Sequence, residues 1–180
     1  MIKRELYMNR IRPFIGGELI KVMTGIRRSG KSVMLELIKE ELAEAGVAPS
    51  QMISINFEDM RYSHLQTATA LHDEIIKRAE GIEGKAYLFF DEIQEVEGWE
   101  KCVNSLRVAL DCDIYITGSN AKLLSGELAT YIGGRYVEFV IYPFSFAEFL
   151  ELYHTIAPSD SIQQCFQKYL LAGGMPYLAN

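Results

Sequence analysis

The stretch GIRRSGKS, from Gly25 to Ser32, follows the pattern G-x-x-x-x-G-K-[ST]. In this pattern the backbone N–H groups of a glycine-containing loop surround a polyphosphate, a lysine reaches the terminal phosphates, and a serine or threonine hydroxyl ligates magnesium. Average residue usage would produce the pattern by chance in about 1% of chains of this length. The residues on either side must therefore decide whether it is a phosphate-binding loop.

The flanking residues predict a strand before this stretch and a helix after it. Residues 18–24 (ELIKVMT) form a short apolar run, and apolar residues then recur at helical spacing from Met34 through Ile38 to Leu42 before Gly46 closes the segment. A loop that opens a helix adds the helix dipole and free N–H groups to a phosphate site. We therefore expect a nucleotide to be bound by Gly25, Ile26, Arg27, Arg28, Ser29, Gly30, Lys31, Ser32 and Val33.

Strands and helices continue to alternate along the chain. Further strands are expected at residues 52–57, 86–90, 112–117 and 136–141, with helices between them, the last carrying Ala121, Leu124, Leu128 and Ile132 on one face. The continuous apolar run at 86–90 is typical of a strand buried on both faces of a parallel sheet. Five strands alternating with helices predict an α/β fold with a parallel sheet and right-handed crossovers.

Beyond Pro143 the pattern changes to helices only. Ser145 and Glu148 form an S-x-x-E capping box that opens one helix, and an apolar stripe from Ile162 to Leu170 marks another. We expect residues 1–142 to be the α/β core, and residues 143–180 to be a helical lid or the start of a helical subdomain.

Charge and composition narrow the class of protein. The net charge is −6, which argues against a protein that coats nucleic acid or an anionic membrane, and no apolar run could span a bilayer or serve as a signal peptide. We therefore expect a cytoplasmic protein. Eight of the 18 basic residues lie in residues 1–31, where they fit a polyphosphate ligand. For Lys3 and Arg4, a solvated terminal segment is an equally good interpretation.

Two carboxylates end the third expected strand, in the sequence FFDE. In open α/β sheets, ligands bind at the carboxyl ends of the strands. There Asp91 could hold magnesium through water, and Glu92 could act as the base that polarises the water attacking the γ-phosphate. A hydrolase needs this second carboxylate, whereas a small-molecule kinase does not.

Polar residues also follow the fourth expected strand, in the sequence ITGSN. If this strand neighbours the one before the loop, Ser119 or Asn120 would lie beside the γ-phosphate, where an amide can orient the attacking water. The same residues are also good caps for the helix that follows. Both roles remain open from the sequence.

Together these segments resemble a known family. The chain is similar to the prokaryotic AAA-type P-loop ATPases, which are related to the signal-transduction ATPases with numerous domains and join this domain to a C-terminal domain of unknown function. The resemblance covers nearly the whole chain and rests on GIRRSGKS, YLFFDEIQEVEGWEKCV, ITGSNAKLLSGELATYIGGRY, YPFSFAEFLEL and YLLAGGMPYL.

The resemblance implies a three-layer sandwich with sheet order 5-1-4-3-2 and a domain that binds and hydrolyses Mg-ATP. It implies magnesium near Ser32 and Asp91, Glu92 as catalytic base, a polar sensor at Ser119 or Asn120, and Arg135 as the arginine finger. It also implies that the chain is the N-terminal part of a longer protein, so that any nucleic-acid contact would come from segments absent here.

Three functions are consistent with these residues. The first is an ATPase domain that switches or drives a downstream domain, with a homo-oligomer compatible with it and no membrane partner. The second is a small-molecule or nucleotide kinase, which would need a lid with several arginines, and residues 143–180 contain none. The third is a regulatory module that binds ATP and hydrolyses it slowly.

Overall fold

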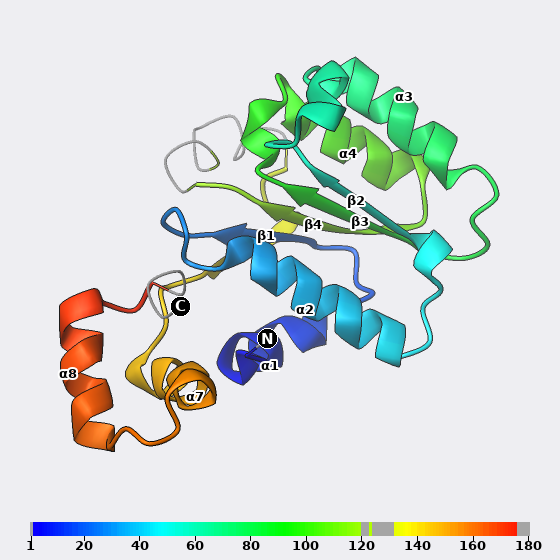
Figure 1. The fold of residues 1–180 in the computed structure, drawn as a ribbon. Helices are drawn as coiled ribbons and strands as arrows, with labels where there is room; N and C mark the ends of the chain where they lie inside the picture. The colour runs from blue at the N-terminus through cyan, green and yellow to red at the C-terminus, as the bar shows by residue number, and fades with distance from the viewer. Residues whose placement is uncertain (1, 120–122, 124–131, 176–180) are drawn as a thin grey trace.

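A parallel five-stranded sheet lies between two layers of helices (Figure 1). This computed structural model describes residues 2–119, 123 and 132–175. The strand order is β2-β3-β4-β1-β5, and each neighbouring pair is parallel. Both the three-layer α/β fold and the 5-1-4-3-2 order are therefore confirmed.

The elements follow the predicted alternation closely. The strands are β1 (Ile20–Thr24), β2 (Met52–Asn56), β3 (Ala86–Asp91), β4 (Cys112–Thr117) and β5 (Tyr136–Val140). The α-helices are α1 (Glu5–Ile11), α2 (Lys31–Glu44), α3 (Ala68–Ala79), α4 (Trp99–Ala109), α7 (Phe146–Ile156) and α8 (Ile162–Ala172). Short 3-10 helices cover Arg12–Phe14, Pro49–Gln51, Met60–Leu65 and Ile93–Glu95.

Two differences from the sequence expectations concern helices. Helix α1 was not expected, because its buried residues Tyr7, Met8 and Ile11 give too short an apolar pattern. The helix expected around Leu124 and Leu128 lies mostly outside the described residues. Ile132, assigned to its apolar face, is buried as expected but lies in a bend.

Alternate residues of the strands pack against opposite helical layers. On one face, Leu88 and Phe90 of β3 join the core beneath α3 and α4. On the other face, Phe89 of β3 packs with Met34 and Ile38 of α2 and with α1. The central strands are thus buried on both sides, as their continuous apolar runs predict.

A charged network is buried at the amino end of the sheet. Lys21 of β1 and Asp113 of β4 form an ion pair, and neither side chain is exposed to solvent. Asp113 also accepts hydrogen bonds from the Tyr115 hydroxyl at 2.6 Å and the Gly16 N–H at 2.7 Å. Burial lowers the pKa of Lys21, an effect opposed by Asp113, and burial raises the pKa of Tyr115. The network therefore fixes β1 against β4 through satisfied polar groups.

Helices α7 and α8 follow β5, pack against each other and project away from the sheet (Figure 1). Phe149 of α7 forms an apolar cluster with Ile2 and Phe144, separate from the clusters on the two faces of the sheet. The Ser145–Glu148 capping box opens α7 as predicted, with the Ser145 hydroxyl accepting from the Glu148 N–H at 3.3 Å. The Phe149 ring stacks on Tyr153 within α7 and meets Tyr169 of α8 edge-on. Within the described residues, no helix combines the length and apolar character needed to cross a membrane.

Asp113→Ala should lower the free energy of unfolding by about 3–5 kcal/mol, because it leaves Lys21 buried without its partner. Asp111→Ala is the matched control, since Asp111 is an exposed partner of Lys85, and its loss should cost about 1 kcal/mol or less. Urea denaturation measures both. Equal effects of the two substitutions would contradict the assigned role of the buried pair.

Candidate functional site

The stretch Gly25–Ser32 forms a loop between the carboxyl end of β1 and the first turn of α2. Gly25 and Gly30 adopt positive φ angles of 150° and 97°, and Arg28 adopts 66°. A Cβ on Gly25 would lie 2.2 Å from the carbonyl oxygen of Ile141. Glycine is therefore required at position 25 for both conformation and space.

The loop presents a mixed surface. The side chains of Ile26, Arg27 and Arg28 are exposed, and Arg27 forms an ion pair with Glu58 at 3.7 Å. Ser29 is buried, and its hydroxyl oxygen has no hydrogen-bond partner among the described residues. An unpartnered buried hydroxyl in a glycine loop at a helix N-terminus fits an anionic ligand.

Lys31 begins α2 and is buried to 4% exposure. Its ammonium lies 3.4 Å from the carbonyl oxygen of Ile26 and 3.4 Å from Oε1 of Glu92. The lysine of the loop and the second carboxylate of the FFDE sequence are thus in direct contact. Lys31, which is predicted to bind phosphate, and Glu92, which is predicted to act as the base, therefore lie side by side where α2 begins and β3 ends.

Asp91 ends β3 and is held from both sides. The Thr117 hydroxyl donates to one of its carboxylate oxygens, and the Asn56 amide donates to the other at 3.2 Å. Ser32, the other expected magnesium ligand, is exposed in the first turn of α2. A carboxylate and a hydroxyl are hard oxygen donors of the kind that Mg²⁺ prefers.

Glu92 has an unusual backbone conformation for a residue that is not glycine. Its φ is 55° and its N–H donates to the Thr117 hydroxyl oxygen at 3.0 Å. Such a left-handed residue costs on the order of 1–3 kcal/mol and is often found at functional sites. Its carboxylate Oε2 accepts from the Gln94 amide at 2.6 Å. Both oxygens of Glu92 therefore have fixed contacts, one with Lys31 and one with Gln94.

Gln94 also faces the segment that follows β4. Its Oε1 atom is buried without a hydrogen-bond partner among the described residues, and it would lie 2.2 Å from a Cβ added to Gly118. Ser119 follows at the same edge, and its carbonyl oxygen accepts from the Leu123 N–H at 3.0 Å, as a helix-capping residue would. Asn120, the alternative sensor, lies outside the described residues.

Arg135 lies away from these groups. It precedes β5, its carbonyl accepts from the Ile20 N–H at 2.9 Å, and Tyr136 pairs with Ile20 at the start of β1. The loop follows the opposite end of β1, five residues or roughly 16 Å along the strand. Its guanidinium donates to Asn104 at 2.9 Å. Glu138, the carboxylate three residues further along β5, accepts from the Thr24 hydroxyl.

Three residues of the site were not singled out by the sequence analysis: Asn56, Gln94 and Thr117. Asn56 and Thr117 end β2 and β4, so the same strand-end argument that selected Asp91 could have found them. The sequence left a solvated segment open for both Lys3 and Arg4. Lys3 is exposed, but Arg4 is 2% exposed and contacts the loop.

A glycine loop opening a helix beside a central parallel strand, with an acidic pair ending a nearby strand, defines a P-loop nucleotide-binding domain. The family comparison agrees, because a family described as AAA domain matches residues 18–150, and this chain belongs to it. By family and fold it is a nucleotide-binding ATPase domain.

Two relatives are longer proteins. An uncharacterized protein of Haemophilus influenzae is 44% identical over 176 residues, which cover 98% of this chain and 44% of that protein. The uncharacterized protein MJ1544 of Methanocaldococcus jannaschii is 36% identical over 166 residues, covering 87% of this chain and 35% of that protein. The chain therefore spans less than half the length of these relatives.

Solved structures share the fold at low identity. AMPPCP-bound DnaA from Aquifex aeolicus has a TM-score of 0.63 and 13% identity, covering 99% of this chain and 58% of that chain. A RuvB variant from Thermotoga maritima has a TM-score of 0.65 and 14% identity, with coverage of 99% and 59%. The Aeropyrum pernix Orc1 protein in complex with DNA has a TM-score of 0.60 and 18% identity, with coverage of 88% and 50%.

Gly25→Ala should destabilise the protein more than Gly46→Ala and should also weaken ATP binding. Both glycines have positive φ, but a Cβ at Gly46 meets open space, so that substitution should cost only about 1–2 kcal/mol. Urea denaturation and titration with a fluorescent ATP analogue measure the two effects. Equal losses of stability would show that the Ile141 carbonyl does not constrain the loop.

Proposed function

We propose that the domain binds Mg-ATP at Gly25–Val33 and hydrolyses it, with Glu92 as the general base. The contact between Lys31 and Glu92, at 3.4 Å, carries the proposal. It supports a site in which the cation that attracts the terminal phosphates and the carboxylate that would accept a proton from water are neighbours. Such a base must lie within reach of the water it activates.

Each residue has a distinct role in this proposal. Loop N–H groups and the Lys31 ammonium bind the phosphates, because both favour an anion beside them. Ser32 and Asp91 would hold magnesium, which would neutralise charge on the phosphate oxygens. Thr117 and Asn56 orient Asp91 through their hydrogen bonds.

ATP would also change the contacts of Glu92. A polyphosphate carries more negative charge than one carboxylate, so it competes with Glu92 for the Lys31 ammonium. Glu92 Oε1 would then become available to a water molecule, while Gln94 keeps hold of Oε2. Glu92 would thus lose its contact with Lys31, and become able to act as a base, only when ATP has bound. Ser119 or Asn120 could orient the water from the end of β4.

We propose that ATP hydrolysis by this domain switches or drives a downstream domain. The lengths of the Haemophilus influenzae and Methanocaldococcus jannaschii relatives support this, since this chain covers 44% and 35% of them. Residues 143–180 would then be a lid or the start of a helical subdomain between the core and that domain. A cytoplasmic location fits this role.

Glu92→Gln should retain ATP binding and lose at least about 100-fold in turnover, because the amide keeps the shape but cannot accept a proton. Lys31→Ala should lose ATP binding itself. Calorimetric titration and phosphate release distinguish the two results. Glu95→Gln, which changes an exposed carboxylate three residues away, is the control and should keep the wild-type rate. Full steady-state hydrolysis by Glu92→Gln would assign the base to another residue.

We propose Arg135 as an arginine finger for a neighbouring subunit. Its distance along β1 from its own loop argues against a role in cis, and its exposed position fits an outward contact. A guanidinium on the γ-phosphate oxygens stabilises the charge of the transition state. The proposal requires a homo-oligomer.

Arg135→Ala should lose hydrolysis on its own but recover it when mixed with Glu92→Gln, since each variant supplies what the other lacks. Phosphate release from the single variants and the mixture gives the answer. Asn104→Ala, which removes the partner of Arg135 within the chain, should leave activity unchanged. Loss without recovery would contradict the role in trans, and wild-type rates from Arg135→Ala would exclude any catalytic role.

A further inference from the structure

Arg4 is buried although it is only the fourth residue of the sequence. Its side chain is 0% exposed, and its guanidinium lies between the rings of Tyr7 and Phe144, 4.5 and 5.1 Å from their centroids. Its backbone has a φ of 41°, an uncommon conformation for a residue with a side chain. A fully buried guanidinium requires specific partners, because an unpaired buried charge is strongly unfavourable.

Those partners come from three separate segments. Nε donates to Glu148 Oε1 at 2.7 Å, and Nη2 donates to the Tyr142 carbonyl at 2.8 Å. Nη1 donates to the Ser29 carbonyl at 3.0 Å. One side chain therefore joins the N-terminal segment to the phosphate-binding loop, the segment between β5 and α7, and the first turn of α7.

The contact with Ser29 has a geometric consequence for the loop. A trans peptide is planar, so its C=O and the following N–H point in opposite directions. By holding the Ser29 carbonyl, Arg4 fixes the direction of the Gly30 N–H. Nη1 also lies 3.3 Å from the position that a Cβ on Gly30 would take, so the guanidinium packs directly against this peptide.

Glu148 secures the other side of Arg4. It also accepts from the Ser145 N–H at 2.8 Å, which makes it part of the α7 capping box. Burial acts to raise the pKa of Glu148, but the hydrogen bonds from Arg4 and Ser145 outweigh it and hold that pKa below its ordinary value. The carboxylate is thus stabilised in the charged form that Arg4 needs.

We infer that Arg4 is a positioning residue that sets the Ser29–Gly30 peptide for phosphate binding and links the shape of the loop to the docking of α7. The inference rests on the proposed ATP site. Because linkage is reciprocal, a change at α7 that weakens its hold on Arg4 must alter nucleotide affinity, and bound nucleotide must alter the stability of the α7 contact.

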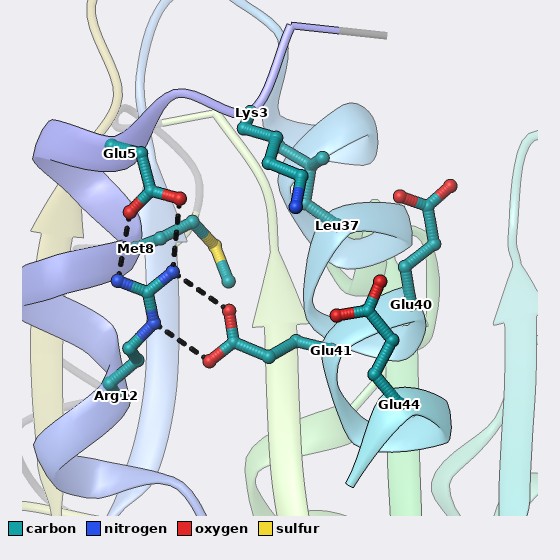
Figure 2. Close-up of a pocket in the computed structure, with 8 residues that line it drawn as sticks. All are labelled: Lys3, Glu5, Met8, Arg12, Leu37, Glu40, Glu41 and Glu44. Carbon is teal, nitrogen blue, oxygen red and sulfur yellow. Dashed lines mark hydrogen bonds and ion pairs between the residues drawn. The ribbon is translucent and has the colours of Figure 1, made fainter.

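Arg12 provides a matched comparison. It is also an N-terminal arginine, it binds two carboxylates, Glu5 and Glu41, and it lines a hollow between α1 and α2 (Figure 2). Glu41 lies near the end of α2 that is remote from the loop. Arg12 thus shares with Arg4 the residue type and the pairing with a carboxylate, but its side chain is 36% exposed and it has no contact with the Ser29 carbonyl.

The first test compares Arg4→Lys, Glu148→Gln and Arg12→Lys in steady-state ATP hydrolysis. Lysine keeps the charge of Arg4 but lacks the planar fork that reaches three partners. Arg4→Lys should raise KM about tenfold with kcat within about threefold, the pattern of lost ground-state binding. Glu148→Gln should raise KM less, and Arg12→Lys should leave it unchanged. If Arg4→Lys had the wild-type KM, the inference would be overturned. If Glu148→Gln had the wild-type KM, the link between the loop and α7 would be overturned.

The second test does not depend on hydrolysis. Amide hydrogen exchange by mass spectrometry, without added nucleotide, should show faster exchange in residues 25–34 and 143–156 for Arg4→Lys but not for Arg12→Lys. If the wild-type protein proved unable to hydrolyse ATP, the proposed function would fail and this exchange pattern would still decide the role of Arg4. Unchanged exchange in both segments would overturn it.

Discussion

The Thr117 hydroxyl is the group on which the arrangement of the site depends. It donates to Asp91 and accepts from the N–H of Glu92, so the end of β4 fixes both residues of the acidic pair at the end of β3. The parallel register makes this possible, because it brings the carboxyl ends of β1, β3 and β4 to one edge. Lys31 follows the loop after β1, so it lies at the same edge and contacts Glu92 there.

The two ends of the sheet contain polar groups with different roles: those at the amino end stabilise the fold, and those at the carboxyl end form the candidate site. Its amino end contains the buried pair of Lys21 and Asp113, fully satisfied and remote from the loop. Its carboxyl end contains the left-handed Glu92 and the unpartnered hydroxyl of Ser29. The polar groups at the amino end hold β1 and β4 together. At the carboxyl end, the backbone of Glu92 is strained and the Ser29 hydroxyl makes no hydrogen bond within the described residues, and such features are common at functional sites.

The sequence predicted those features that depend on local pattern. The strands, the glycine loop before α2 and the acidic end of β3 follow from apolar periodicity and from residue types at fixed spacing. Gln94 lies in the segment YLFFDEIQEVEGWEKCV, which carries part of the family resemblance. Its hydrogen bond to Glu92 could not be predicted, because it depends on the conformation of a 3-10 turn. The burial of Arg4 could not be predicted, because no local pattern reports partners more than a hundred residues away.

The separation between Arg4 and its partners also affects how the protein is made. Arg4 leaves the ribosome well before two of its partners, because Tyr142 and Glu148 lie 138 and 144 positions later in the chain. Contacts this distant in sequence form late, since the intervening chain must first be synthesised and ordered. The loop can adopt its local turn early, but its Ser29 carbonyl acquires its complete set of supports only after β5 and α7 have emerged. A growing chain would therefore contain the phosphate-binding sequence while all the elements from β2 to α7 are still being added, before the finished site exists.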